Sequence, residues 1–253
     1  MRVTFIAVAA FAAFVAAVPA SQARAQSASE LVAKNAAARG GAQKLAAIAS
    51  IHFAGKLVVP GDLELQYSET RARHNGQARY ESSLQGLTLV QGYDGKTAWR
   101  INPFEGRRDA ERMSEDDMRA LADDATIDGP LLSANARRST VSYLGREDFE
   151  GTDTFKLRVR EADGSEYVYF LDPDTFLEIK VVETRKLRGA RQVTLTEYGD
   201  YEAVGGVYFP FAIERGPLDS TPAQREKLII ESAEPNVRVD PASFTMPAMP
   251  AAK

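Results

Sequence analysis

A tight β-hairpin is the feature of the sequence that most constrains its fold. Two short apolar runs, 87–93 and 97–101, flank the pair Asp94-Gly95. Such a pair favours a hairpin turn, because glycine adopts a positive φ without steric cost. The second run contains Trp99, the single tryptophan of the chain, and Pro103 follows it. Proline cannot donate to a sheet ladder, so the sequence predicts two paired strands and then a different kind of segment.

The alternation of apolar and polar residues continues on both sides of this hairpin. It begins at Ile51, and turn signals recur at 60–62, 75–76, 163–164 and 172–174. A period of two is typical of strands with one buried and one solvated face. We count about eleven strands, about six of them before residue 105, joined mostly by short loops. The pattern predicts a mainly β (α+β) fold with one antiparallel sheet.

Short helical segments are predicted before the first strand. Ser27 and Glu30 form a capping box, and apolar residues follow at helical spacing. Gly40-Gly41 ends this helix, because glycine adopts the left-handed conformation at a helix end. A second helical piece covers 42–49.

The segment 105–135 interrupts the strand pattern. Ser114 precedes three acidic residues, which identifies it as a helix N-cap with acids in the first turn. An apolar stripe follows, and Asp128-Gly129-Pro130 is expected to end the helix, with Leu131-Leu132 in a loop. We interpret the segment as one helical insertion between two halves of the sheet.

Residues 1–25 have the properties of a secretory signal peptide. Arg2 precedes an apolar run over 3–18, and Ala23-Arg24-Ala25 fits the small-residue cleavage pattern. We expect export to the periplasm and cleavage after Ala25; an uncleaved anchor is the alternative. The remaining chain is expected to form one domain over 26–240 and a tail rich in proline and alanine over 241–253.

The sequence lacks the usual catalytic signatures. It has no cysteine and only two histidines, His52 and His74, neither of which neighbours a plausible nucleophile in the sequence. No nucleophile elbow, phosphate-binding loop or zinc-protease motif occurs. The carboxylates of 172–174 and 116–117 are explained as a turn and a helix start. We therefore expect no catalytic residue, no metal site and no cofactor. The net charge of −4 argues against nucleic acid as a partner.

Several segments, in this order along the chain, resemble the LolA-like, outer-membrane lipoprotein-sorting proteins. They are Glu30-Leu31-Val32-Ala33-Lys34 with 38–48, Gly92-Tyr93-Asp94-Gly95-Lys96-Thr97-Ala98-Trp99 with 102–104, Asp128-Gly129-Pro130-Leu131-Leu132, Tyr169-Phe170-Leu171-Asp172-Pro173-Asp174-Thr175, and Gly205-Gly206-Val207-Tyr208-Phe209-Pro210-Phe211.

This resemblance implies a strongly curved, half-open antiparallel barrel whose concave apolar face is covered by helices. It also implies a periplasmic carrier of acylated, hydrophobic cargo, a lipoprotein or a lipid, in outer-membrane lipoprotein transport. Transient membrane-associated donor and acceptor proteins would be its partners.

The alternating apolar residues supply the candidates for the ligand-binding cavity. A partly filled barrel encloses a ligand cavity, whereas the interior of a filled barrel is only a hydrophobic core. For each candidate residue, the alternative is that it belongs to such a core. Trp99 is expected to be a wall residue beneath the lid. The cavity candidates are Leu57, Val59, Leu65, Tyr67, Leu89, Trp99, Ile101, Phe155, Leu157, Val159, Tyr169 and Ile179, and the lid candidates are Met113, Met118, Leu121, Leu131 and Leu132.

Two other functions remain open at this stage. The same fold could serve as a non-catalytic envelope sensor or regulator, which would bind a protein partner. An enzyme that acts on lipid or glycan is disfavoured by the missing catalytic groups.

Overall fold

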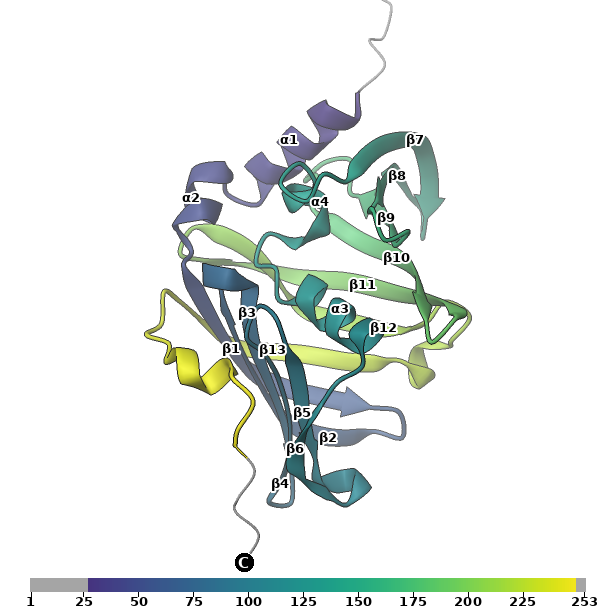
Figure 1. Cartoon of the computed structure of the whole chain (residues 1–253). Coiled ribbons are helices and arrows are strands. Elements are labelled where there is room, and N and C mark those ends of the chain that lie inside the picture. The colour runs from purple at the N-terminus through teal and green to yellow at the C-terminus, as the bar shows by residue number, and fades with distance from the viewer. Residues whose placement is uncertain (1–26, 249–253) are drawn as a thin grey trace, which may run out of the picture.

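The computed structural model describes residues 27–248 and has one large, curved, unclosed antiparallel sheet of thirteen strands (Figure 1). The strands are β1 (Ser50–Val59), β2 (Leu63–Ala72), β3 (Gln77–Leu84), β4 (Leu87–Tyr93), β5 (Ala98–Asn102), β6 (Arg107–Arg112), β7 (Thr140–Phe149), β8 (Thr152–Arg160), β9 (Glu166–Leu171), β10 (Glu178–Leu187), β11 (Ala190–Val204), β12 (Val207–Pro217) and β13 (Glu226–Pro235). The helices are α1 (Ala28–Ala38), α2 (Ala42–Ala47), α3 (Glu115–Asp124) and α4 (Gly129–Ser133), with 3-10 turns η1 (His74–Gly76), η2 (Pro103–Glu105), η3 (Pro222–Gln224) and η4 (Pro241–Phe244).

The strand order is β6-β5-β4-β3-β2-β1-β13-β12-β11-β10-β9-β8-β7. Among the described strands, each neighbouring pair is consecutive in the chain except β1 and β13, which join the two halves of the sheet. The β1–β13 register shifts between Ala54 and Gly55. A Cβ at Gly55 would lie 2.0 Å from the Ile229 carbonyl oxygen, so the bulge requires glycine.

One segment connects the two outer edges of the sheet. β6 and β7 lie at opposite ends of the strand order, yet they follow one another in the chain. Residues 113–139, here called the crossing segment, carry α3 and α4 between them. In Figure 1 this segment passes over the concave face of the sheet. The curved sheet and the crossing segment therefore enclose space between them.

The structure confirms the predicted fold class and the capping box at Ser27. It also confirms the hairpin of 87–101. The turn centres on Gly95-Lys96, because the Asp94 carboxylate accepts from the backbone N–H groups of Lys96 and Thr97 at 2.9 and 2.8 Å.

Two expectations for 105–135 were wrong. β6 lies where a helix was expected, and α4 begins at Gly129 instead of a loop. Pro130 fits there, because the first helical turn needs no N–H donor.

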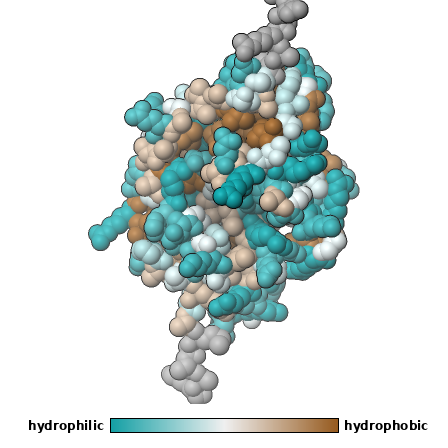
Figure 2. All heavy atoms as spheres, turned by 45° about the horizontal axis from the view of Figure 1, so that its top comes forward, coloured by the Kyte–Doolittle hydropathy of each residue, from teal (hydrophilic) through white to brown (hydrophobic). Residues whose placement is uncertain are grey.

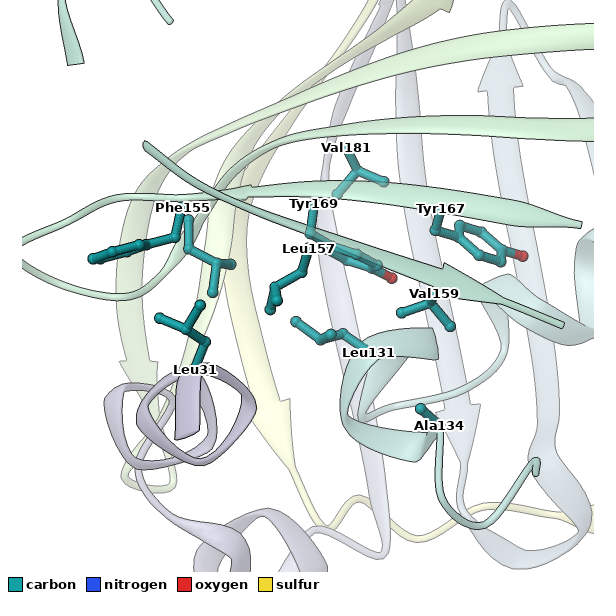
Figure 3. Close-up of a cluster of buried hydrophobic side chains, with 10 residues drawn as sticks. Leu31, Leu131, Ala134, Phe155, Leu157, Val159, Tyr167, Tyr169 and Val181 are labelled. Atoms are coloured by element: carbon teal, nitrogen blue, oxygen red, sulfur yellow. The ribbon is translucent and has the colours of Figure 1, made fainter. Parts of the chain in front are cut away.

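Two clusters of buried side chains fill parts of the concave side. The first joins strands β8–β10 to α1 and α4: Figure 3 shows Leu31 and Leu131 pointing at Leu157 and its neighbours on the sheet. The second lies under α2 and contains Leu45, Ile48 and residues of β1, β12 and β13. Neither cluster fills the middle of the concave side, where a cavity remains.

The convex side is covered in part by the C-terminal segment. Phe244 of η4 and Trp99 of β5 are both fully buried, and the indole Nε1 donates to the Phe244 carbonyl at 2.8 Å. The ring lies over Gly92, the cross-strand partner of Trp99, where a Cβ would clash with the indole. Residues 241–244 of the expected tail are thus packed on the sheet, and 249–253 lie outside the described residues.

The exposed surface mixes polar and apolar side chains. Figure 2 shows hydrophilic groups over most of the visible face, with hydrophobic residues gathered in its upper part. Within residues 27–248, we find no helix whose length and hydropathy would allow it to cross a membrane.

We predict that Phe244→Ala lowers the free energy of unfolding by about 3–5 kcal/mol, because it removes a fully buried ring. It should also shift the Trp99 emission to longer wavelength as water reaches the indole. Denaturant unfolding followed by tryptophan fluorescence measures both effects. Phe104→Ala, at a side chain that is 44% exposed, is the matched control. Equal losses in the two variants would contradict this packing.

Candidate functional site

A cavity of about 470 Å³ lies between the concave face of the sheet and the crossing segment. Strands from both halves contribute to it. α3, the α3–α4 connection and the first turn of α4 close it through Leu121, Asp123, Asp124, Ile127 and Pro130. This volume is within the range of pockets that hold one small molecule.

The apolar part of the wall is centred on the junction of the two sheet halves. Leu57 of β1 and Leu228 of β13 are cross-strand partners and both line the cavity. The remaining apolar lining from the sheet consists of Phe53, Leu89, Val181, Phe209, Pro210, Ile213 and Ile230.

A polar part of the wall lies on β2, β3 and β4. Strand register aligns Glu69, Tyr80 and Gln91 in one row and Tyr67, Ser82 and Leu89 in the next. All six side chains line the cavity, and so does Arg71 one row further along β2. The inward-facing positions of β2 therefore change from apolar to charged along the strand.

The structure brings a subset of the predicted cavity residues together. Leu57, Tyr67, Leu89 and Tyr169 line the cavity, as does the predicted lid residue Leu121. Their contact with a ligand remains a prediction.

Other predicted cavity residues on the concave side are packed as core. Phe155, Leu157 and Val159 are buried beneath α1 and α4, where Leu131 also packs (Figure 3). Leu65 is buried, and Val59 is half-buried at the end of β1, but neither lines the cavity. Ile179 is the extra residue of a bulge in β10 and does not line it either.

Trp99 and Ile101 lie on the face opposite the cavity. On the neighbouring strand β4, Leu89 and Gln91 line the cavity, whereas Trp99 and Ile101 pair with Gly92 and Val90, which point the other way. The position of Trp99 under Phe244 thus differs from the one expected beneath the lid, because the segment around Phe244 buries the face of β5 that carries Trp99.

The other expected lid residues have separate places in the crossing segment. Met113 follows β6 and Met118 lies on α3, and both are half-buried. Leu132 of α4 packs against the core cluster under α2. None of these three lines the cavity.

Ion pairs hold the C-terminal end of α3 on the second half of the sheet. The buried Asp123 carboxylate pairs with Arg137 and Arg185 and accepts a hydrogen bond from the Tyr167 hydroxyl at 2.7 Å. The next residue, Asp124, pairs with Arg215 of β12 at 3.2 Å.

The α3–α4 connection is held on the other half of the sheet by Asp128. Its carboxylate accepts two hydrogen bonds from the Arg73 guanidinium, at 2.6 and 2.8 Å. Arg73 also donates to the carbonyls of Ile48 and Leu45, which fixes the guanidinium beside α2. The crossing segment is thus attached to both sides of the sheet by charge-assisted hydrogen bonds.

Sequence reasoning missed the charged residues of the cavity. Arg39, Glu69, Arg71, Glu178 and Arg215 all line it, together with Asp123, Asp124, Glu183 and Glu226. The period of two contained the signal, because Glu69 and Arg71 share the face of Leu65 and Tyr67. The sequence does not show that this face bounds open space, where water or a ligand can meet charges.

Burial shifts the ionisation of several carboxyls near Asp123. It raises the pKa of the Glu161 carboxyl to about 7, with the charge of Asp123 acting in the same direction and Arg137 opposing it. The Glu161 side chain is 7% exposed, and its Oε2 lies 3.1 Å from an Arg137 nitrogen. Burial also raises the pKa of Glu183, against the effect of Arg185 and Arg215.

The described residues contain no cluster of three or more histidine, aspartate or glutamate side chains able to hold a metal ion. His52 hydrogen-bonds Thr70 at 2.9 Å in a groove beside Val237 and Arg238, away from the main cavity.

We predict that Glu161→Gln removes part of the pH dependence of stability. The folded-state pKa of Glu161, about 7, exceeds its ordinary value of 4.5, so the folded protein binds this proton more tightly than the unfolded chain. The resulting stabilisation is complete below about pH 4.5 and is lost as the pH rises through about 7. Thermal unfolding midpoints at several pH values should therefore fall less for the variant across this window. Parallel curves for the two proteins would contradict the assignment.

Several solved structures have the same fold, and three bacterial examples show the extent of the likeness. An outer-membrane lipoprotein-sorting protein domain from Vibrio parahaemolyticus is 11% identical, with a TM-score of 0.54, over 80% of this chain and 94% of that one. A LolA superfamily protein from Nitrosomonas europaea is 13% identical, with a TM-score of 0.53, over 87% and 98% of the two chains. A DUF1329 family protein from Desulfovibrio piger is 10% identical, with a TM-score of 0.57, over 86% and 97%.

No family model and no curated protein matches the sequence. At these identities the likeness concerns the fold, and it extends over most of both chains. The order of motifs along the sequence and the architecture agree on the same group of proteins. This chain has the fold of the LolA-like, outer-membrane lipoprotein-sorting proteins.

Proposed function

We propose that this protein is a periplasmic carrier that holds an acylated, hydrophobic ligand in the cavity under the crossing segment. The observation that carries the proposal is the cavity of about 470 Å³, whose apolar wall centres on Leu57 and Leu228 and which Leu121 of α3 helps to close. If side chains filled the whole concave side of this sheet, it would hold a hydrophobic core and no ligand cavity. Here the filling stops at the two clusters under α1, α2 and α4.

The attachment of α3 suits a lid that opens. Its contacts with the second half of the sheet include the pair of Asp124 with Arg215, whose side chains are 40% and 38% exposed. At its N-terminal end Asp116 accepts from the Arg188 backbone N–H at 2.7 Å. Such exposed ion pairs exchange readily with water when a helix moves, whereas a large apolar contact must be exposed at a higher cost. Movement of α3 would give an acyl chain access to the cavity.

The fold and the N-terminal sequence support the setting of this activity. Proteins that share the fold include an outer-membrane lipoprotein-sorting domain, and residues 1–25 have the pattern of a cleaved export signal. The ligand would be a lipoprotein acyl group or a lipid, which a membrane-associated donor delivers and a membrane-associated acceptor receives. The activity is transport without a chemical step.

Extraction of lipids from the purified protein, followed by mass spectrometry, tests the proposal directly. We expect an acyl-bearing molecule in stoichiometric amount, or stoichiometric uptake of an added fluorescent acyl probe. A protein that neither retains nor takes up any acyl ligand would refute the carrier function.

We predict that Leu228→Asp weakens binding of the acyl probe at least about tenfold, because it places a charge on the apolar wall. Ile229→Asp is a closely matched control, since Ile229 is the next residue of β13 and is 46% exposed. Probe titration measures affinity, and thermal unfolding measures the folding of both variants. Equal weakening by the two substitutions would show that the probe does not bind in this cavity.

A further inference from the structure

The polar wall of the cavity has hydrogen-bond donors that the protein leaves unused. Arg71 donates through Nε to Glu69, and no described residue accepts from its two Nη groups. Its side chain is 26% exposed and lines the cavity. Tyr80, the cross-strand partner of Glu69, also lines the cavity, and within residues 27–248 its buried hydroxyl has no hydrogen-bond partner. A ligand in the cavity can therefore find donors here.

Three carboxylates of the cavity wall, in contrast, already have partners. Glu69 accepts from the Tyr67 hydroxyl at 2.6 Å as well as from Arg71. Across the cavity, Asp124 and Glu183 lie 3.2 and 3.4 Å from the two Nη atoms of Arg215. The polar group of a ligand that pairs with Arg71 and Tyr80 is consequently an acceptor.

The charge balance of the cavity selects the kind of acceptor. The lining contains six carboxylates and three arginines. Each of these arginines forms an ion pair with a carboxylate: Arg39 with Glu178, Arg71 with Glu69, and Arg215 with Asp124. An anionic ligand would bring a further negative charge with no free cation to balance it, and burial of such a charge is costly. A neutral carbonyl oxygen accepts the same hydrogen bonds without this cost.

The geometry points to an acyl-ester site: we propose that Arg71 and Tyr80 donate to the carbonyl oxygen of an ester-linked acyl chain. The cavity then prefers esterified chains to free fatty acids. The acyl chain lies along the apolar wall at Leu57 and Leu228, which belongs to the adjoining strands. Burial raises the pKa of the Tyr80 phenol well above its ordinary value, which keeps the hydroxyl proton available for donation. This inference rests on the proposed carrier function and adds the chemical class of the ligand.

Competition against a fluorescent acyl probe at neutral pH tests the preference. The competitors are methyl dodecanoate, dodecanoate and dodecane, which share the chain length and differ in the polar group. We expect the ester to bind the wild-type protein about five- to tenfold more tightly than the alkane, as the net contribution of one hydrogen bond would produce, and more tightly than the carboxylate.

Tyr80→Phe is the decisive variant, because it removes a hydroxyl that has no hydrogen-bond partner in the described part of the chain. It should reduce the advantage of the ester over the alkane, with alkane affinity and thermal stability unchanged. The double variant Glu69→Gln/Arg71→Met removes the ion pair as a unit, so it leaves no unpaired buried charge, and it should abolish the remaining advantage. Tyr208→Phe, at a tyrosine that does not line the cavity, is the control.

The outcomes separate the two proposals. Equal affinities for ester and alkane, or an ester advantage that survives both variants, would overturn the ester site and leave the carrier function standing. Tighter binding of dodecanoate than of its methyl ester would also overturn it. Failure of the wild-type protein to bind the probe or any competitor would refute both the carrier function and the ester site.

Discussion

The two edge strands of the sheet are neighbours in the chain, and this constraint determines the rest of the architecture. Because β6 and β7 lie at opposite ends of the strand order, the residues between them must span the concave side. The same residues therefore cover the sheet and bound the cavity. The crossing segment is the covalent connection between the two halves of the meander, so one stretch of chain both joins the halves and covers the cavity.

The crossing segment combines apolar contacts at some points with charged contacts at others. Leu131 packs in the core with α1, whereas the neighbouring α3 presents Asp123 to Arg185 of β10 and Asp124 to Arg215 of β12. A helix attached mainly by charges leaves volume beneath it, because carboxylate and guanidinium groups meet at their tips and do not interdigitate as aliphatic chains do. The polar composition of α3 thus helps to explain why a cavity remains beneath it.

The sheet was predictable from the sequence because its contacts are local. Alternation and turn residues such as Gly95 specify each hairpin without knowledge of the rest of the chain. The site was harder to predict, because alternation separates the two faces of a strand without saying which one is concave. Trp99 shows the difficulty: a distant segment around Phe244 buries the convex face of β5, so apolar character there does not mark the cavity. Arg71 shows the converse, a charged side chain that faces inward.

The pairing of β1 with β13 has a consequence for the order of folding. The other strand pairs of the described chain are hairpins of adjacent strands or successive members of a meander, whereas Ile51 pairs with Pro235 across almost the whole domain. Contacts between residues so far apart in sequence form slowly, since the intervening chain must first lose its conformational freedom. The two halves can each assemble from local hairpins, and their union waits for the last strand to be synthesised. Until that moment both β1 and β12 present an open edge, which makes this junction the point where a folding chain is most exposed to aggregation.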